Sequence, residues 1–193
     1  SLAVRLSQGQ LGNIEIEYLG DVANHDTTPL KAAVIKGLLG PVSEENVTIV
    51  NANLIAETRG MKIVERKGPA PQEYTNLIRV HLHSSHGDTD VAAIVSHNGP
   101  RIVAINDYAD VEVPPGEGWL VLVENHDRPG TIGVVGMLFG EHKINISHMS
   151  VGRDPKRGHA LMALRTDGEV PQNVLDELVA VPNIISARVA ELT

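Results

Sequence analysis

The chain has 193 residues, of which 42% are hydrophobic, and a formal net charge of −8 at pH 7. This length and apolar content allow one large core or two small ones, which excludes a disordered polypeptide. The 16 Lys and Arg residues are scattered along an acidic chain, so we expect no nucleic-acid partner. The absence of cysteine excludes disulfides, thiolate nucleophiles and thiolate metal sites.

No apolar stretch reaches the roughly 20 residues that a membrane span requires. The run AAVIKGLLGPV, residues 32–42, is interrupted by Lys36 and by glycine. We also find no secretory signal at the start, and we therefore expect a cytoplasmic protein without a membrane partner. The opening SLAVRLSQGQ lacks methionine, which is typical of a piece of a longer protein or of a processed natural terminus.

The first predicted elements are a strand and two helices. Residues 12–20, GNIEIEYLG, alternate apolar and acidic side chains with the period of a half-buried strand. A helix is predicted to follow, with Thr28 as its N-cap, Pro29 at its first position and Gly40 near its end. A second helix is predicted to end at Gly60, which can adopt the left-handed conformation. The side chains of the first helix that share a face, and are expected to face the core, are Leu30, Ala33, Val34 and Leu38.

Four short strands are predicted next, with turns at SSHGDTD and NGP. Their residues are 61–67, 76–84, 91–100 and 101–108. The first domain is therefore predicted to be a mixed α/β module with a largely antiparallel sheet. The stretch VEVPPGEGW, residues 111–119, has two prolines and two glycines, which cannot sustain a helix or a central strand. We place the domain boundary there, with domains at 1–116 and 117–193.

The second domain is predicted to have the order βαββαβ, which is the ferredoxin-like arrangement. Its first strand, GWLVLVEN, hardly alternates and is expected to be buried on both faces. Two helices would cover one face of the sheet and leave the other face in need of a cover or a partner. The fold class is therefore α/β (α+β). The elements after the first strand are expected at 131–142 (helix), 144–154 (strand), 155–158 (turn), 159–166 (strand), 170–182 (helix) and 183–192 (strand).

The helix at 131–142 has an unusual glycine spacing. Gly130, Gly133 and Gly136 follow G-x-x-G-x-x-G, whereas a dinucleotide-binding turn requires G-x-G-x-x-G and an acidic residue at the end of the next strand. We therefore expect no nucleotide site, and we expect the glycines to allow close packing on the sheet or on another backbone. The residues expected to face inward are Ile132, Val135, Met137 or Leu138, and Phe139.

The loop NHDRPG, residues 125–130, is the candidate binding site. Free amide groups at a helix start attract a carboxylate, and here Pro129 and Gly130 directly precede the helix. Asn125 and Asp127 can accept hydrogen bonds from an ammonium group, so a free amino acid would be matched at both ends. The alternative is that Asp127 is an ordinary N-cap. His126, beside the proposed ligand, could make binding sensitive to pH.

The segment VENHDRPGTIGVVGMLFGEHKINISHMSVGRD resembles the ACT domain, in the version that ends bacterial D-3-phosphoglycerate dehydrogenases. The resemblance implies that two such domains pair edge to edge and bind L-serine at the joint. By position, the contacts would be Asn125 and Asp127 from one subunit and Asn145 from the other. Asn145 could instead be an ordinary residue at the start of a strand.

Residues 1–116 resemble the allosteric substrate-binding domain of the longer form of these dehydrogenases. The stretches that carry the resemblance are GQLGNIEIEYLGDVANHDTTPLKAAVIKGLLGP and VNANLIAETRG. The resemblance implies an anionic effector held by basic side chains, which match Arg101 and Arg165 by position. Guanidinium suits phosphate because its donors form a fork. A third basic position near PPGEG is missing, and either arginine could be ordinary surface charge.

The sequence contains no recognisable catalytic centre. There is no G-x-S-x-G turn. His81, His83 and His86 in HLHSSH have a spacing that can hold a transition metal, but we expect no metal there. Whether the chain belongs to an enzyme is therefore left open.

These observations leave three hypotheses open. The first is a regulatory part of D-3-phosphoglycerate dehydrogenase that binds L-serine as feedback inhibitor and self-associates through its ACT domains. Its catalytic domains and their NAD would lie N-terminal to this chain, which would itself hold no cofactor. The second is a subunit of an iron–sulfur L-serine dehydratase, which carries a related domain. The third is an orphan amino-acid sensor with a different ligand.

Overall fold

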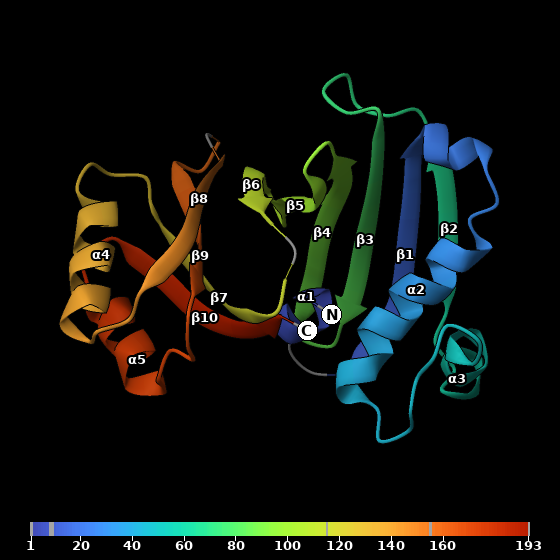
Figure 1. The fold of residues 1–193 in the computed structure, drawn as a ribbon, viewed down its shortest axis with the longest axis horizontal. Coiled ribbons are helices and arrows are strands. Elements are labelled where there is room, and N and C mark those ends of the chain that lie inside the picture. The colour runs from blue at the N-terminus through green and yellow to red at the C-terminus, as the bar shows by residue number, and fades with distance from the viewer. Residues whose placement is uncertain (1, 8–9, 115, 155, 193) are drawn as a thin grey trace. The chain divides into compact units, whose positions relative to one another are not determined.

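The computed structural model of the chain describes residues 2–7, 10–114, 116–154 and 156–192. It divides into two compact units, Ser1–Arg101 and Ile102–Thr193, and Figure 1 shows the elements of each. The division falls inside strand β5 (Gly99–Ile105). Among the described residues, no helix has the length and apolarity that crossing a lipid bilayer would take.

The first unit is a mixed α/β module, as predicted. Its sheet has the order β4-β3-β1-β2, in which β1 is antiparallel to β3 and parallel to β2. Its strands are β1 (Leu11–Gly20), β2 (Ile63–Gly68), β3 (Asn76–Ser84) and β4 (Gly87–Ser96). Its helices are α1 (Leu2–Leu6), α2 (Thr28–Leu39) and α3 (Ala52–Thr58), with short 3-10 helices η1 (Asp21–Asn24) and η2 (Gly40–Val42).

Alternation along β1 creates the core of the first unit. Ile14, Ile16 and Tyr18 are fully buried and pack with Leu38 and Leu82, because every second side chain of a strand points to the same face. The prediction of a half-buried strand here is confirmed.

The details of α2 differ from the prediction. The N-cap is Thr27, with no side-chain cap, because the Thr28 backbone amide donates instead to Asp26 Oδ1 at 3.0 Å. This hydrogen bond holds the pKa of Asp26 below its ordinary value. The predicted inward face was partly wrong, since Ala33 is exposed. The side chains that α2 buries are Ala32, Ile35, Leu38 and Leu39.

The end of α3 agrees with the prediction. The helix stops at Thr58, and Gly60 has a φ of +68°, in the left-handed region that glycine adopts without strain.

The second unit contains the predicted βαββαβ order and is ferredoxin-like. In its sheet the strands lie in the order β10-β7-β9-β8, and each pair of neighbouring strands is antiparallel. The elements are β7 (Gly118–His126), α4 (Thr131–Glu141), β8 (Ile146–Asp154), β9 (His159–Thr166), α5 (Gln172–Ala180) and β10 (Ile184–Leu192).

Helices α4 and α5 lie together on one side of this sheet (Figure 1). Val135 and Phe139 of α4 are buried in a core with Val121, Met162 and Leu178. Ile132, which the pattern placed inward, is not buried, since it is 47% exposed. Of the alternatives Met137 and Leu138, Leu138 packs against the core and Met137 is 67% exposed. Together with Val134, which is 42% exposed, Met137 forms a further apolar surface of the helix that the described part of the chain leaves open.

The hairpin of β5 and β6 (Tyr108–Val113) lies against the second face of the sheet, which is the face opposite α4 and α5. Strand β6 is antiparallel to β5, and its Ala109 pairs with Arg153 of β8. The contact is close: a Cβ at Gly152 would lie 2.3 Å from Val111 Cγ2 and 2.5 Å from the Ala109 carbonyl oxygen. The prediction of a cover or partner for this face is thus met in part by the chain itself.

The stretch 111–119 was expected to interrupt regular structure before the strand GWLVLVEN, and a strand that ends inside it at Val113 was not predicted. β6 continues to Val113 and β7 begins at Gly118, because the prolines lie between the strands. Pro115 lies outside the described residues, as does Pro155 of the turn expected at 155–158. The domain limits 1–116 and 117–193 stay a prediction.

Candidate amino-acid-binding site

The candidate loop, residues 125–130, joins the end of β7 to the start of α4. Its backbone is anchored on both sides, since the Asp127 amide donates to the Gly158 carbonyl at 2.9 Å and the His126 amide to that of Asn183 at 2.8 Å. Gly158 precedes β9 and Asn183 precedes β10, so the loop is held by two neighbouring strands.

Asn125, the first residue of this loop, still belongs to β7 and is only 2% exposed. Its Nδ2 donates to the carbonyl oxygens of Val123 at 3.3 Å and Ala160 at 3.2 Å. The amide nitrogen therefore fixes the loop against β9, and only the oxygen of this side chain remains for a ligand contact.

The start of α4 has an unusual cap. Gly130 is the N-cap in the left-handed conformation, with a φ of +91°, and no side chain caps the helix. The alternative prediction that Asp127 is an ordinary N-cap is therefore wrong. Pro129 and Gly130 are exposed, so the positive end of the helix dipole faces solvent beside the Asp127 carboxylate.

Asp127 forms an ion pair that sequence reasoning missed. Its Oδ2 lies 3.1 Å from Arg153 Nε, and the side chains are 39% and 72% exposed. A pair this exposed contributes at most about 1 kcal/mol, so a ligand cation can compete for the carboxylate. Nothing in the local sequence signals this pair, because Arg153 reaches Asp127 only through the register of the sheet.

Asn145 does not lie near the loop within one chain. It directly precedes β8, and its Nδ2 donates to Asp167 Oδ2 at 2.7 Å. Asp127 lies instead beside Arg153, near the other end of this 9-residue strand. At about 3.3 Å per residue, the two ends of β8 are roughly 26 Å apart. The single chain thus brings together the four predicted site residues of the loop, Asn125, Asp127, Pro129 and Gly130. Asn145 lies away from them.

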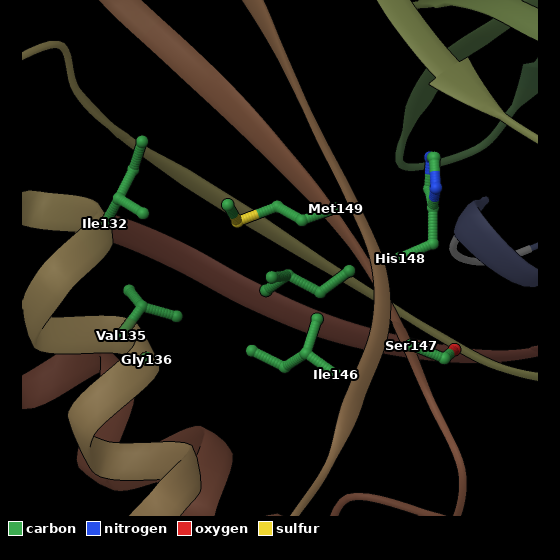
Figure 2. A pocket seen from close by; sticks show the side chains of 8 residues that line it. Ile132, Val135, Gly136, Ile146, Ser147, His148 and Met149 are labelled. Atoms are coloured by element: carbon green, nitrogen blue, oxygen red, sulfur yellow. The ribbon is translucent and has the colours of Figure 1, made fainter.

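A hollow of about 360 Å³ lies between α4 and β8. Figure 2 shows Ile132 and Val135 of α4 facing Ile146 and Met149 of β8 across it, while His148 points away. Sequence reasoning missed this hollow because it assigned Ile132 to the core. The remaining lining residues are Gly136, Ser147, His148 and Leu164.

The glycines of α4 lie in open space. Apart from the adjacent residues and the nearby backbone of α4 itself, no described atom comes within 4 Å of a Cβ placed on Gly133, Gly136 or Gly140. The expectation that these glycines let α4 pack closely on its own sheet is therefore wrong. Close packing on another backbone stays a prediction.

The arginines predicted to hold an anion both have protein partners. Arg101 Nε donates to Ser96 Oγ at 3.3 Å. Arg165 donates to the carbonyl oxygens of Pro114 at 3.1 Å and Glu117 at 2.5 Å, and so fixes the turn that enters β7. Their role toward an anion stays a prediction.

The histidines of HLHSSH pair separately with neighbouring polar groups. His81 Nδ1 lies 2.5 Å from Asp90 Oδ2, and His83 Nδ1 lies 3.0 Å from Asp88 Oδ1. His86 Nδ1 is 2.9 Å from Ser85 Oγ. Within the described ranges, no group of three or more histidine, aspartate or glutamate side chains is arranged to hold a metal.

The βαββαβ topology, the loop before α4 and the hollow beside it define a protein with an ACT domain, and residues 119–183 match the ACT domain family. Residues 1–106 match the D-3-phosphoglycerate dehydrogenase intervening domain. Because that match spans more than half of the chain, the chain belongs to the D-3-phosphoglycerate dehydrogenase family.

Curated relatives agree with this assignment. The chain is 32% identical to D-3-phosphoglycerate dehydrogenase of Methanocaldococcus jannaschii over 192 residues, covering 100% of this chain and 36% of that protein. It is 33% identical to the Bacillus subtilis enzyme over 193 residues, with 100% and 36% covered. The chain thus spans about a third of the length of these relatives.

Proposed function

We propose that this chain is the regulatory part of a D-3-phosphoglycerate dehydrogenase and binds L-serine as the feedback inhibitor of serine biosynthesis. The catalytic domains, with their NAD, would lie N-terminal to it in the whole protein. The observation that carries the proposal is the uncapped, exposed start of α4 beside the half-exposed Asp127, in the ACT domain of a chain from this family.

The chemistry of the loop suits a free amino acid. The start of α4 at Pro129 and Gly130 offers backbone amides and a positive dipole to the carboxylate of the ligand. The carboxylate of Asp127 and the amide oxygen of Asn125 would accept hydrogen bonds from its ammonium group. Both charges of the zwitterion are then matched within one loop.

The remaining contact, Asn145, would come from a second copy of the chain. If two β8 edges pair antiparallel, the start of one strand lies beside the end of the other, which brings Asn145 of one copy to the Asp127 loop of its mate. Such pairing requires β6 to leave Arg153, to which its Ala109 is paired in the single chain. The half of β8 nearest Asn145 borders the hollow, and the exposed Ile132 and Met149 beside it would be buried by such pairing. Self-association is thus part of the proposal.

Calorimetric titration of L-serine tests the binding site. We expect heat and saturation with the intact chain, and about 10- to 100-fold weaker binding by Asp127→Ala and Asn145→Ala, since each loses a hydrogen bond involving a charged group. Asp176→Ala on α5 is the matched control and should bind normally. No heat at millimolar serine, or normal affinity in both site variants, would refute the proposal.

Mixing the two site variants tests whether the site is shared. A mixed pair of Asp127→Ala and Asn145→Ala chains contains one site with both residues intact. Serine binding should therefore reappear on mixing, at up to half the original capacity per mixed pair. If mixing restores nothing while both variants still associate, the two residues do not act across a joint.

An amino-acid sensor with a different ligand is the second candidate, and the apolar lining of the hollow favours it. Titration of glycine, valine and tryptophan alongside L-serine separates the two. Tighter binding of valine or tryptophan than of serine would support the alternative. The family match favours these two candidates, the serine-binding regulatory part and the sensor with another ligand, over a subunit of L-serine dehydratase. A dehydratase subunit would co-purify with a cysteine-rich partner.

A further inference from the structure

A polar cluster fastens the β5–β6 hairpin to the second face of the ACT sheet. Tyr108, the first residue of β6, is 4% exposed and donates its hydroxyl to Glu124 Oε1 of β7 at 2.5 Å. Ser186 of β10 donates to the other oxygen of Glu124 at 3.3 Å. Burial and the Glu124 carboxylate raise the pKa of Tyr108, so the phenol keeps its proton and remains a donor.

Arg157 makes a second contact with the same hairpin. Its Nη2 donates to Asp107 Oδ2 at 2.6 Å, and its guanidinium carbon lies 5.7 Å from the centre of the Tyr108 ring. Its Nε donates to Asp154, which lowers the pKa of that carboxyl. The turn between β8 and β9 therefore holds the turn between β5 and β6.

The turn between β8 and β9 also holds the candidate ligand loop. Gly158, directly after Arg157, accepts the hydrogen bond of the Asp127 amide at 2.9 Å. The Asp127 carboxylate pairs with Arg153, whose backbone partner in β6 is Ala109. Asp127 is thus connected to the hairpin in two ways. Its amide is hydrogen-bonded to Gly158, next to Arg157, and its carboxylate is paired with Arg153, which lies beside β6.

We infer that the β5–β6 hairpin is a latch, closed by Tyr108 and Arg157, and that its release is coupled to the loop at 125–130. A ligand ammonium group that binds the Asp127 carboxylate competes with Arg153 for it. Ligand binding therefore weakens the Asp127–Arg153 ion pair, which is one of the two connections to the hairpin. The chain passes from the first unit to the second within β5, the first strand of this hairpin. This device goes beyond the proposed function, because the latch exists without serine.

Hydrogen exchange of the full, ligand-free chain tests the latch. Tyr108→Phe removes only the hydroxyl, and Arg157→Gln removes the guanidinium that contacts Asp107, Asp154 and the Tyr108 ring. Lys156→Gln in the same turn is the control. We expect both test variants to exchange about ten- to a hundredfold faster in residues 102–113, with a smaller increase in 125–130. The control, and the amides of α5, should be unchanged. Unchanged exchange in 102–113 refutes the latch, and acceleration confined to 102–113 refutes the coupling.

Serine titration then tests the direction of coupling. Because coupling is reciprocal, Tyr108→Phe and Arg157→Gln should bind L-serine several-fold more tightly, and saturating serine should speed exchange in 102–113 of the intact chain. Slower exchange in 102–113 with serine refutes this direction. If serine does not bind at all, the proposed function fails while the ligand-free exchange still decides the latch.

Discussion

Asn125 illustrates how burial changes the role of a single residue. A polar side chain after a strand is a reasonable ligand contact, yet this one is buried and donates to two backbone carbonyl groups. Arg165 is similar, because its guanidinium holds the Pro114 and Glu117 carbonyl groups. A buried polar group must be satisfied inside the protein before it can serve a ligand.

Replacement of Asn125 by alanine should therefore destabilise the second unit. We expect a loss of about 1–3 kcal/mol in the free energy of unfolding, because the carbonyl groups it satisfies stay buried. Asn145→Ala is the matched control, and as an exposed asparagine it should cost less than about 0.5 kcal/mol. Urea unfolding followed by Trp119 fluorescence measures both. Equal losses would contradict the structural role of Asn125.

At the scale of the element, α4 has two apolar surfaces. Val135 and Phe139 pack into the core and Ile132 borders the hollow toward β8, while Met137 is 67% exposed. The glycines Gly133, Gly136 and Gly140 have open space beside them. Glycine in a helix interior lowers stability by up to about 1 kcal/mol relative to alanine. A smooth surface for a second copy would account for this cost.

Substitution of Gly136 by alanine separates stability from association. We expect the helix to gain about 0.5–1 kcal/mol of stability, since the added Cβ meets open space, and the chain to self-associate more weakly. Gly130→Ala should instead cost about 1–2 kcal/mol, because its φ of +91° is left-handed. Unfolding at low concentration and sedimentation measure the two effects. Unweakened association in Gly136→Ala would exclude this surface as the interface.

At the scale of the whole molecule, the ACT sheet needs the hairpin that precedes it. Val111 and Val113 of β6 are buried, as are Leu120, Leu122 and Leu161, which alternation places on the second face of the sheet. A domain cut between residues 116 and 117 would separate these two groups.

A fragment of residues 99–193 should be more stable than one of residues 117–193. Exposing buried Val and Tyr contacts costs about 1.5–3 kcal/mol for each fully buried large apolar side chain, so we expect a difference of at least about 3 kcal/mol. The shorter fragment should also bind a hydrophobic dye. Urea unfolding of both fragments checks this, with residues 107–193 as an intermediate that keeps β6 and lacks β5. Equal stability would show that the hairpin covers nothing essential.

The sequence alone determined the elements and their order. The alternation of Ile14 and Ile16, the unbroken apolar run of β7 and the spacing of the second unit each depend on neighbours in the chain, and so the βαββαβ order and its candidate loop were predictable. The ACT resemblance indicated the same loop. The chemistry of Asp127 and Gly130 was therefore visible before the structure.

Only the tertiary structure decided which polar groups meet and which surfaces remain open. The pairs Asp127–Arg153 and Tyr108–Glu124 join different strands, and the turn of Asp107 meets Arg157 only after the sheet has formed. Ile132 was assigned to the core because periodicity places it on the same side of α4 as Val135, and periodicity cannot show that a hollow separates it from β8. Periodicity is a local property of the chain, whereas register, the cover of a face and the partner of a charge depend on how distant segments pack.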